Sequence, residues 1–302
     1  MQTLTVSHRT RYTYSAPVRF GRHRLMLRPR DSHDLRLLAA HLSISPPARL
    51  SYSHDVFGNS VAYAEFDEPG AVLDIASTID IEHYGIDGPS LPMAEFARHV
   101  PFRYPASELP DLARVIEPQY DDPDGRVLYW ARTVMAPLSR SGPPLTLDVV
   151  QLLAEEIRRQ FTYAARDEEG TQPPIVTLET GSGSCRDFAL LLMEVARGLG
   201  MAARFVTGYL YDPAVDGGDQ VRGAGATHAW TQIYLPGPGW VEIDPTNGLM
   251  GGRNLIRVAV ARDPSQAVPI SGSFDGTMGQ ALGLEVEVSV ALKRDAVPVP
   301  AV

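Results

Sequence analysis

Cysteine is nearly absent from this sequence, because the 302 residues contain only Cys185. A single cysteine excludes an intrachain disulfide and suits a reducing compartment. The N-terminus also lacks a basic segment followed by an apolar run, which is the pattern of a secretory signal. We therefore expect a cytoplasmic protein.

Long apolar runs and an excess of positive charge are missing as well. No stretch approaches the roughly 18 consecutive apolar residues of a membrane span, so no membrane partner is expected. The formal net charge of −9 argues against nucleic acid as a main partner, because phosphate binding needs basic patches. The 8 histidines are scattered and cysteine pairs are absent, so we predict no metal site and no cofactor.

Residues 181–187, with the sequence Gly-Ser-Gly-Ser-Cys-Arg-Asp, have the features of a helix N-terminus. Ser184 is a good N-cap residue, and Asp187 occupies the position of a capping-box acid. The apolar run at residues 188–196 then predicts a buried helix with Cys185 in its first turn.

A cysteine at this position has chemical consequences. The positive end of a helix dipole favours the thiolate, which is the nucleophilic form of cysteine. The backbone N–H groups of the first turn lack helical partners, so they can bind an oxyanion. A buried structural cysteine beside an ordinary N-cap is the alternative interpretation.

A hairpin follows the predicted helix. Residues 227–234 and 240–244 are rich in strand-forming residues, and residues 235–239 have the composition of a turn. A hairpin folded about residue 236 places His228 opposite Asp244. A cysteine, a histidine and an acid that orients the histidine form the nucleophile–base–orienter arrangement. For His228 taken alone, a histidine satisfied within the core is the alternative.

Four blocks of the sequence resemble the transglutaminase-like superfamily of cysteine acyl-transfer enzymes in order and spacing: residues 183–189, 200–209, 228–230 and 239–247. The resemblance is strong over residues 145–250, and the rest of the chain resembles bacterial members that carry an N-terminal β domain. It implies an α+β fold with a papain-like core, in which a nucleophile helix packs on an antiparallel sheet. A small β-sandwich precedes this core.

The same resemblance implies a catalytic triad of Cys185, His228 and Asp244. The implied activity is acyl transfer at the amide bonds of a peptide or protein through a thioester, with hydrolysis favoured. A protein-glutamine transglutaminase is the alternative enzyme, and a retired binding or assembly module is the alternative without activity. Calcium dependence is not expected, since no acidic loop has calcium-binding spacing.

Further residues are candidates for supporting an oxyanion. In relatives, an aromatic donor upstream of the cysteine can stabilise it, and Tyr163 is the candidate here by position. Gln160 is the second candidate, and Ser184 is a third supporting residue beside the nucleophile. A purely structural role in the core is the alternative for Tyr163.

The chain divides into three predicted segments. Residues 1–85 contain several short strand patterns typical of a small β-sandwich. Residues 86–144 are rich in proline and predict a partly helical connector. Residues 145–295 form the predicted catalytic domain, with further strands at residues 254–260 and 284–292. The sequence gives no expectation for the oligomeric state.

Overall fold

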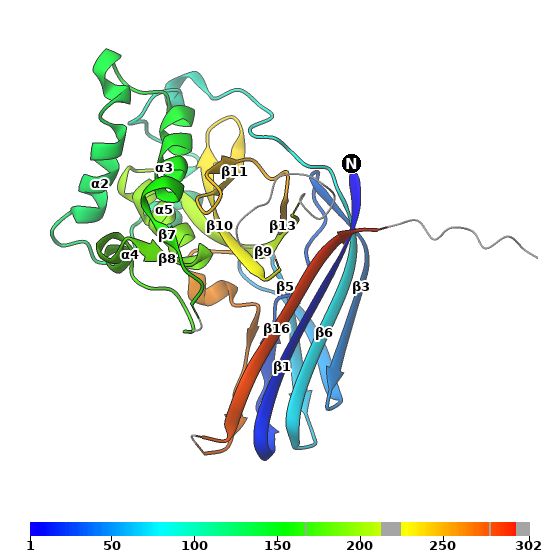
Figure 1. Cartoon of the computed structure of the whole chain (residues 1–302). Coiled ribbons are helices and arrows are strands. Elements are labelled where there is room, and N and C mark those ends of the chain that lie inside the picture. Colours follow the sequence, from blue (N-terminus) through cyan, green and yellow to red (C-terminus); the bar gives the residue numbers. More distant parts are fainter. Residues whose placement is uncertain (167, 213–224, 278, 294–302) are drawn as a thin grey trace, which may run out of the picture.

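The computed structural model describes residues 1–166, 168–212, 225–277 and 279–293. These residues form a β-rich part and a mixed part with five α-helices, which lie side by side in Figure 1. Within the described residues, no helix is long and apolar enough to cross a membrane.

Two antiparallel sheets make up the β-rich part. Strands of the first sheet have the order β15–β1–β6–β3, and β16 also pairs with β1. The second has the order β14–β2–β5–β4. The strands of the first sheet are β1 (Gln2–Phe20), β3 (Leu35–Ser45), β6 (Gly70–His83), β15 (Phe274–Asp275) and β16 (Ala281–Leu292). Those of the second are β2 (His23–Leu25), β4 (Ala48–His54), β5 (Ser60–Phe66) and β14 (Ile270–Ser271).

Side chains that point alternately to the two faces of these strands explain the sandwich. Because successive side chains point to opposite faces of a sheet, every second residue can enter the core. Phe20 and Leu25 meet Leu73 and Ile75 in an apolar core between the two sheets. The small β-sandwich predicted from the sequence is therefore present.

The C-terminal strands belong to this sandwich. The sequence places residues 284–292 in the catalytic domain, whereas β16 pairs with β1 along most of its length. Strand β14 likewise pairs with β2. The alternation of apolar residues with glutamate and serine in β16 predicts a half-buried strand, but it does not identify the strand's partner.

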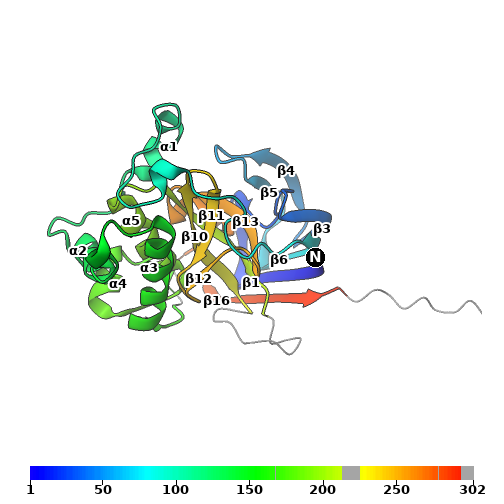
Figure 2. The ribbon, with the colours of Figure 1, turned by 90° about the horizontal axis from the view of Figure 1, so that it is seen from above.

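The mixed part contains the predicted helix on an antiparallel sheet. Its sheet has the order β12–β11–β10–β9–β13, and α5 packs on β9 and β10. In Figure 2 the helices cover one side of this sheet and the β-rich part covers the other. The α+β fold class predicted from the sequence is confirmed. The strands of the sheet are β9 (Ala203–Leu210), β10 (Thr227–Leu235), β11 (Gly239–Asp244), β12 (Leu249–Met250) and β13 (Leu255–Ala261).

Helices of the mixed part include two in the predicted connector, residues 86–144. These are α1 and α2, which pack against α5 and so extend the mixed part toward the N-terminus. The helices are α1 (Leu109–Ile116), α2 (Arg126–Met135), α3 (Thr146–Gln160), α4 (Pro174–Thr180) and α5 (Cys185–Gly198). The short elements are the 3₁₀ helices η1 (Glu95–Ala97), η2 (Leu138–Ser141) and η4 (Pro264–Ala267), and the strands β7 (Thr162–Tyr163) and β8 (Ser182–Gly183).

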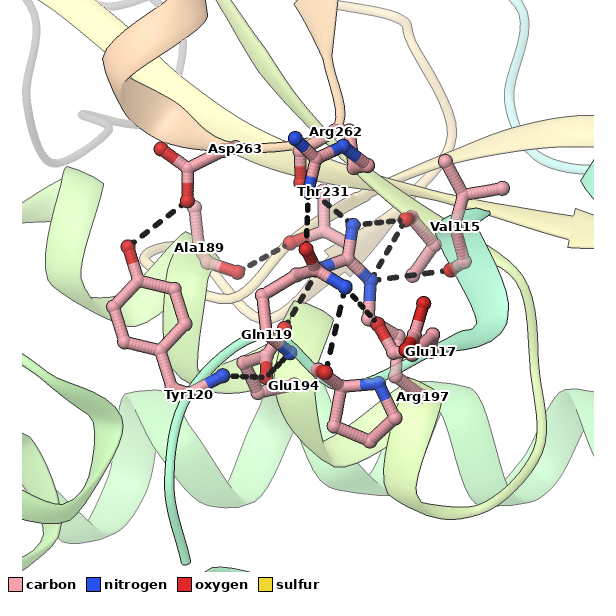
Figure 3. Close-up of polar contacts among 12 residues, drawn as sticks. Val115, Glu117, Gln119, Tyr120, Ala189, Glu194, Arg197, Thr231, Arg262 and Asp263 are labelled. Carbon is pink, nitrogen blue, oxygen red and sulfur yellow. Dashed lines mark hydrogen bonds and ion pairs between the residues drawn. The ribbon is translucent and has the colours of Figure 1, made fainter. Parts of the chain in front are cut away.

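A buried ion pair fixes the C-terminal half of α5 (Figure 3). Arg197 donates to Glu194 at 2.7 Å and to the carbonyl of Arg262 at 2.7 Å. Glu194 in turn accepts the backbone N–H groups of Gln119 and Tyr120, at 2.8 and 3.1 Å. Since a buried charge needs several partners, this network ties the helix to the connector and to the end of β13.

An apolar layer joins the two parts of the molecule. Leu4 and Ile81 of the first sheet pack with Tyr209 of β9 and Ile256 of β13. Within this layer, the His8 ring bonds the Tyr209 hydroxyl at 2.9 Å and Thr10 at 3.0 Å. Burial lowers the pKa of His8 to about 4, so the imidazole is neutral in the folded protein at neutral pH.

The neutral His8 predicts a loss of stability in mild acid. The unfolded chain takes up the proton near the ordinary histidine pKa of about 6.5, whereas the folded protein resists protonation until about pH 4. Stability from His8 is therefore complete above about pH 6.5 and is lost as the pH falls toward 4. We expect urea unfolding at about pH 5 to give a free energy about 2 kcal/mol below that near pH 7. A His8→Gln variant should show a shallower pH dependence, and an equal slope in both proteins would contradict this account.

Candidate active site

Cys185 is the first residue of α5 and is 7% exposed. Asp187 accepts hydrogen bonds from the backbone N–H and the hydroxyl of the N-cap residue Ser184, each at 2.8 Å. The helix therefore begins where the capping pattern predicts. At this position the backbone N–H of Cys185 has no helical acceptor and lies at the positive end of the helix dipole.

Asp187 also fixes the loop that precedes α4. Its second carboxylate oxygen accepts from the Arg166 guanidinium and from the backbone N–H of Gln172, each at 2.8 Å. Gly183 lies directly against this cluster, where a Cβ atom would be 2.8 Å from that of Asp187. The structural need for Gly183 is thus close packing on Asp187.

Tyr163 lies beside the cysteine. Strand β7 pairs in parallel with β8, which places Tyr163 level with Gly183, two residues before Cys185. Burial, the charge of Cys185 and a hydrogen bond to its side chain raise the pKa of Tyr163 to about 12, although Arg186 acts in the opposite direction. The phenol therefore stays protonated and can donate a hydrogen bond close to the sulfur.

Two other supporting candidates differ in their placement. Gln160 is the last residue of α3, where its amide donates to Glu156 and accepts from Trp130 at the surface. The structure does not bring Gln160 to Cys185, because its position at the helix end directs the amide along the outside of α3. Ser184 does adjoin Cys185, but its hydroxyl donates to Asp187. Its role in this arrangement is to cap α5.

His228 is the second residue of β10 and is almost completely buried. Its Nε2 atom lies 3.0 Å from Asp244 Oδ2. Nδ1 has no hydrogen-bond partner of normal geometry, but Cys185 is close enough to interact with the ring. Burial lowers the pKa of His228, whereas the Asp244 carboxylate and Cys185 raise it; the attraction prevails and brings the pKa to about 10.

Asp244, at the end of β11, is held by more than the histidine. Its Oδ1 accepts the backbone N–H groups of Thr246 and Asn247, at 2.9 and 3.3 Å. Its Oδ2 accepts the Asn247 side-chain amide at 2.8 Å, in addition to His228. Burial opposes ionisation, but these donors and the charge of His228 lower the pKa of Asp244. A carboxylate fixed in this way can orient the imidazole.

The register of the β10–β11 hairpin differs from the prediction. Leu235 pairs with Gly239, so the hairpin folds about residue 237 rather than 236. This register makes His228 and Asp244 diagonal neighbours instead of directly opposite residues. The shift in pairing is two residues, which keeps both side chains on the same face of the sheet. The predicted contact therefore forms across the diagonal.

Trp230 forms a wall beside the histidine. Its ring stacks on His228, with centroids 6.0 Å apart and an angle of 26° between the planes. Gly208 of β9 pairs with His228 and lies under the same indole. A Cβ atom on Gly208 would lie 2.1 Å from the carbonyl oxygen of Ile256 and 2.8 Å from the Trp230 ring. Only glycine therefore fits at this position.

A Gly208→Ala substitution should disturb the packing under Trp230 and thereby the site. The added methyl group must displace β13 or the indole that packs on His228, and overpacking of this kind typically costs about 1–3 kcal/mol. We expect a reduced free energy of unfolding and slower alkylation of Cys185 by iodoacetamide. A Gly283→Ala substitution is the control, because that glycine lies in open space. Two variants of equal stability and reactivity would contradict the packing argument.

Sequence reasoning assigned no side-chain role to three contributors to this arrangement: Asn247, Trp230 and Arg166. A signal for Asn247 was available, because an asparagine three residues after a strand-end aspartate can bond that carboxylate in a turn. Trp230 and Arg166 depend on contacts between separate segments. Among the described residues, no cluster of three or more His, Cys, Asp or Glu side chains could hold a metal ion.

The three predicted triad residues thus come together at the N-terminus of α5 and the ends of β10 and β11. A cysteine on a buried helix that packs on an antiparallel sheet, beside a His–Asp pair, is the arrangement expected of the transglutaminase-like superfamily. Comparisons with known proteins agree with this assignment. Residues 4–82 match the model of the bacterial transglutaminase-like N-terminal region, and residues 132–245 match the model of the transglutaminase-like superfamily.

Relatives of similar length extend over most of the chain. An uncharacterized protein of Mycobacterium tuberculosis is 33% identical over 278 residues, which cover 88% of this chain and 86% of the relative. One of Mycobacterium leprae is 25% identical over 296 residues, or 96% of this chain and 99% of the relative. A crystal structure of a candidate cysteine protease from Cytophaga hutchinsonii has a TM-score of 0.71 at 17% identity, covering 98% of this chain and 93% of that one. This chain belongs to the transglutaminase-like superfamily and carries the bacterial N-terminal region of that family.

Proposed function

We propose that this protein is a cysteine-dependent enzyme that hydrolyses amide bonds of a peptide or protein through a thioester intermediate. The observation that carries the proposal is the placement of Cys185 at the N-terminus of α5, in contact with a buried His228 that is fixed by Asp244. Tyr163 also supports an enzymatic function, because its protonated hydroxyl can donate a hydrogen bond next to the sulfur.

The first half-reaction forms the thioester. The Cys185 sulfur attacks the amide carbonyl carbon, and its proton resides on His228, whose raised pKa favours the imidazolium. The developing oxyanion is within reach of the Cys185 backbone N–H, and the Tyr163 hydroxyl is the second candidate donor. His228 then gives its proton to the leaving amine, and the C–N bond breaks.

The second half-reaction releases the acyl group. A water molecule gives a proton to His228 and attacks the thioester carbonyl, and the C–S bond breaks to give a carboxylic acid. This step regenerates the Cys185 thiolate and the protonated His228. Asp244 keeps the imidazole in one orientation through both halves and stabilises its positive charge.

The test compares wild type with Cys185→Ala on a mixed peptide library, with and without a labelled primary amine, and identifies the products by mass spectrometry. Cleaved peptides that disappear in the variant support hydrolysis. Amine-labelled glutamines would replace hydrolysis by transglutamination as the activity. Absence of both products, together with a Cys185 that resists alkylation, would leave a binding module instead.

A further inference from the structure

Strand β16 has an edge to which no described strand is paired. It pairs with β1 on one side only, along residues 281–292. Twelve residues form a long strand for an edge, and an exposed edge offers unpaired backbone N–H and C=O groups to another chain. In Figure 1, β16 lies at the margin of the long sheet, and its lower half extends past the mixed part.

One face of β16 continues the apolar layer between the two parts of the molecule. Val288 and Val290 pack against that layer, which includes Tyr209. On the same face, Leu284 is 55% exposed and Val286 is 45% exposed. The apolar stripe of the interface therefore runs on, uncovered, beyond the point where the mixed part ends.

On the opposite face of the sheet, negative and positive side chains alternate from one strand to the next. Glu285 and Glu287 of β16 lie opposite Arg11 and Arg9 of β1. Both arginines bind Asp74 of β6, and Arg11 does so at 2.9 Å. Because opposite charges on neighbouring strands stabilise a sheet, the next strand in the series should present basic residues beside the two glutamates.

The apolar layer that β16 joins also reaches the strand beside His228. Val288 packs against the cluster that contains Tyr209 of β9. Gly208, the residue before Tyr209, pairs with His228 of β10. Strand β9 therefore connects the layer under β16 to the candidate active site.

We propose that the free edge of β16 binds an extended segment of the polypeptide substrate, in which apolar and basic residues alternate, as an added strand. The proposal rests on the proposed function for the identity of this segment as substrate. Apolar side chains of the segment cover Leu284 and Val286, and its basic side chains lie beside Glu285 and Glu287. A second copy of this chain fits less well, because self-pairing centred on β16 would place Glu285 opposite Glu287.

The test measures peptide binding separately from catalysis. Cys185→Ala protein is titrated into a fluorescent peptide of about nine residues that alternates valine with lysine, and anisotropy reports binding. A peptide that alternates valine with glutamate is the charge control. Two double variants probe the two faces, Leu284→Ser with Val286→Ser and Glu285→Gln with Glu287→Gln. Val56→Ser is the matched control, since Val56 is 91% exposed on the turn between β4 and β5.

We expect the valine–lysine peptide to bind, and each double variant to weaken binding about tenfold or more, because cross-strand pairs and buried apolar side chains both contribute to an added strand. Val56→Ser should bind as the parent does. Equal binding of both peptides, undiminished binding by the double variants, or a dimer that dissociates in the Leu284→Ser, Val286→Ser variant would overturn the proposal.

Alkylation of Cys185 by iodoacetamide, measured in wild type and in the same double variants with Cys185 intact, separates this proposal from the proposed function. If Cys185 is alkylated normally but the peptide does not bind, the proposed docking edge is refuted and the proposed enzymatic function is not. If the peptide binds but Cys185 resists alkylation, the proposed enzymatic function is refuted. The assignment of the bound segment as substrate is then overturned with it.

Discussion

Cys185→Ala is expected to reduce amide-bond cleavage about 10⁴-fold or more, the largest effect that we predict. Alanine removes the atom that forms the thioester, so the remaining oxyanion donors can only assist direct attack by water. The initial rate of product formation, measured by mass spectrometry on the library's best substrate, reports the loss. KM should change little, since the substrate still meets the same surface.

A matched control shows whether the loss belongs to the sulfur. Ser182→Ala changes an equally small side chain three residues earlier, in strand β8, and it should keep nearly all of the activity. Both variants should unfold at the temperature of wild type within a few degrees. Cleavage by Cys185→Ala at more than about a hundredth of the wild-type rate would contradict a role for Cys185 as nucleophile.

His228→Asn is expected to lower kcat/KM about 10³-fold to 10⁴-fold. Asparagine can neither hold the proton of the thiol nor return it to the leaving amine. The same variant should slow iodoacetamide alkylation of Cys185 at about pH 6 by tenfold or more, because the thiolate loses its counter-ion. His33→Asn, which changes an exposed histidine, should alter neither rate.

The pH dependence gives a second readout of His228. Its pKa is raised to about 10, so the imidazolium persists through neutral pH and is lost only as the pH rises toward 10. A folded-state pKa above the unfolded value means that the His228–Asp244 attraction stabilises the protein fully below about pH 6.5 and fades as the pH approaches 10. Wild-type activity should therefore decline on an alkaline limb near pH 10. A limb near pH 7 would mean that Asp244 does not hold His228 as we infer.

Local patterns in the sequence were sufficient to predict the helix that carries Cys185. Ser184 and Asp187 form a capping box whose residues are adjacent in the chain, so the start of α5 follows from local chemistry alone. The contact between His228 and Asp244 was predicted with an incorrect register. The contact still forms because a shift of two residues leaves both side chains on one face of the sheet.

Contacts between distant segments were harder to predict. Tyr163 reaches Cys185 through the short β7–β8 pairing, whereas Gln160, three residues earlier, points along the outside of α3. Nothing in the local sequence distinguishes these two directions. Likewise, β16 has a clear strand pattern, but its partner β1 lies at the other end of the chain. Pairing across such a separation depends on the assembled sandwich rather than on local preference.

Direct detection of the thioester tests the central claim most closely. Wild-type protein would be mixed with an activated peptide ester, quenched in acid within the first turnovers, digested and analysed by mass spectrometry. We predict a mass increase equal to the acyl group on the peptide that contains Cys185, which hydroxylamine removes and which His228→Asn accumulates more slowly. An acyl group on another residue, or turnover of the ester by Cys185→Ala at the wild-type rate, would contradict the assignment.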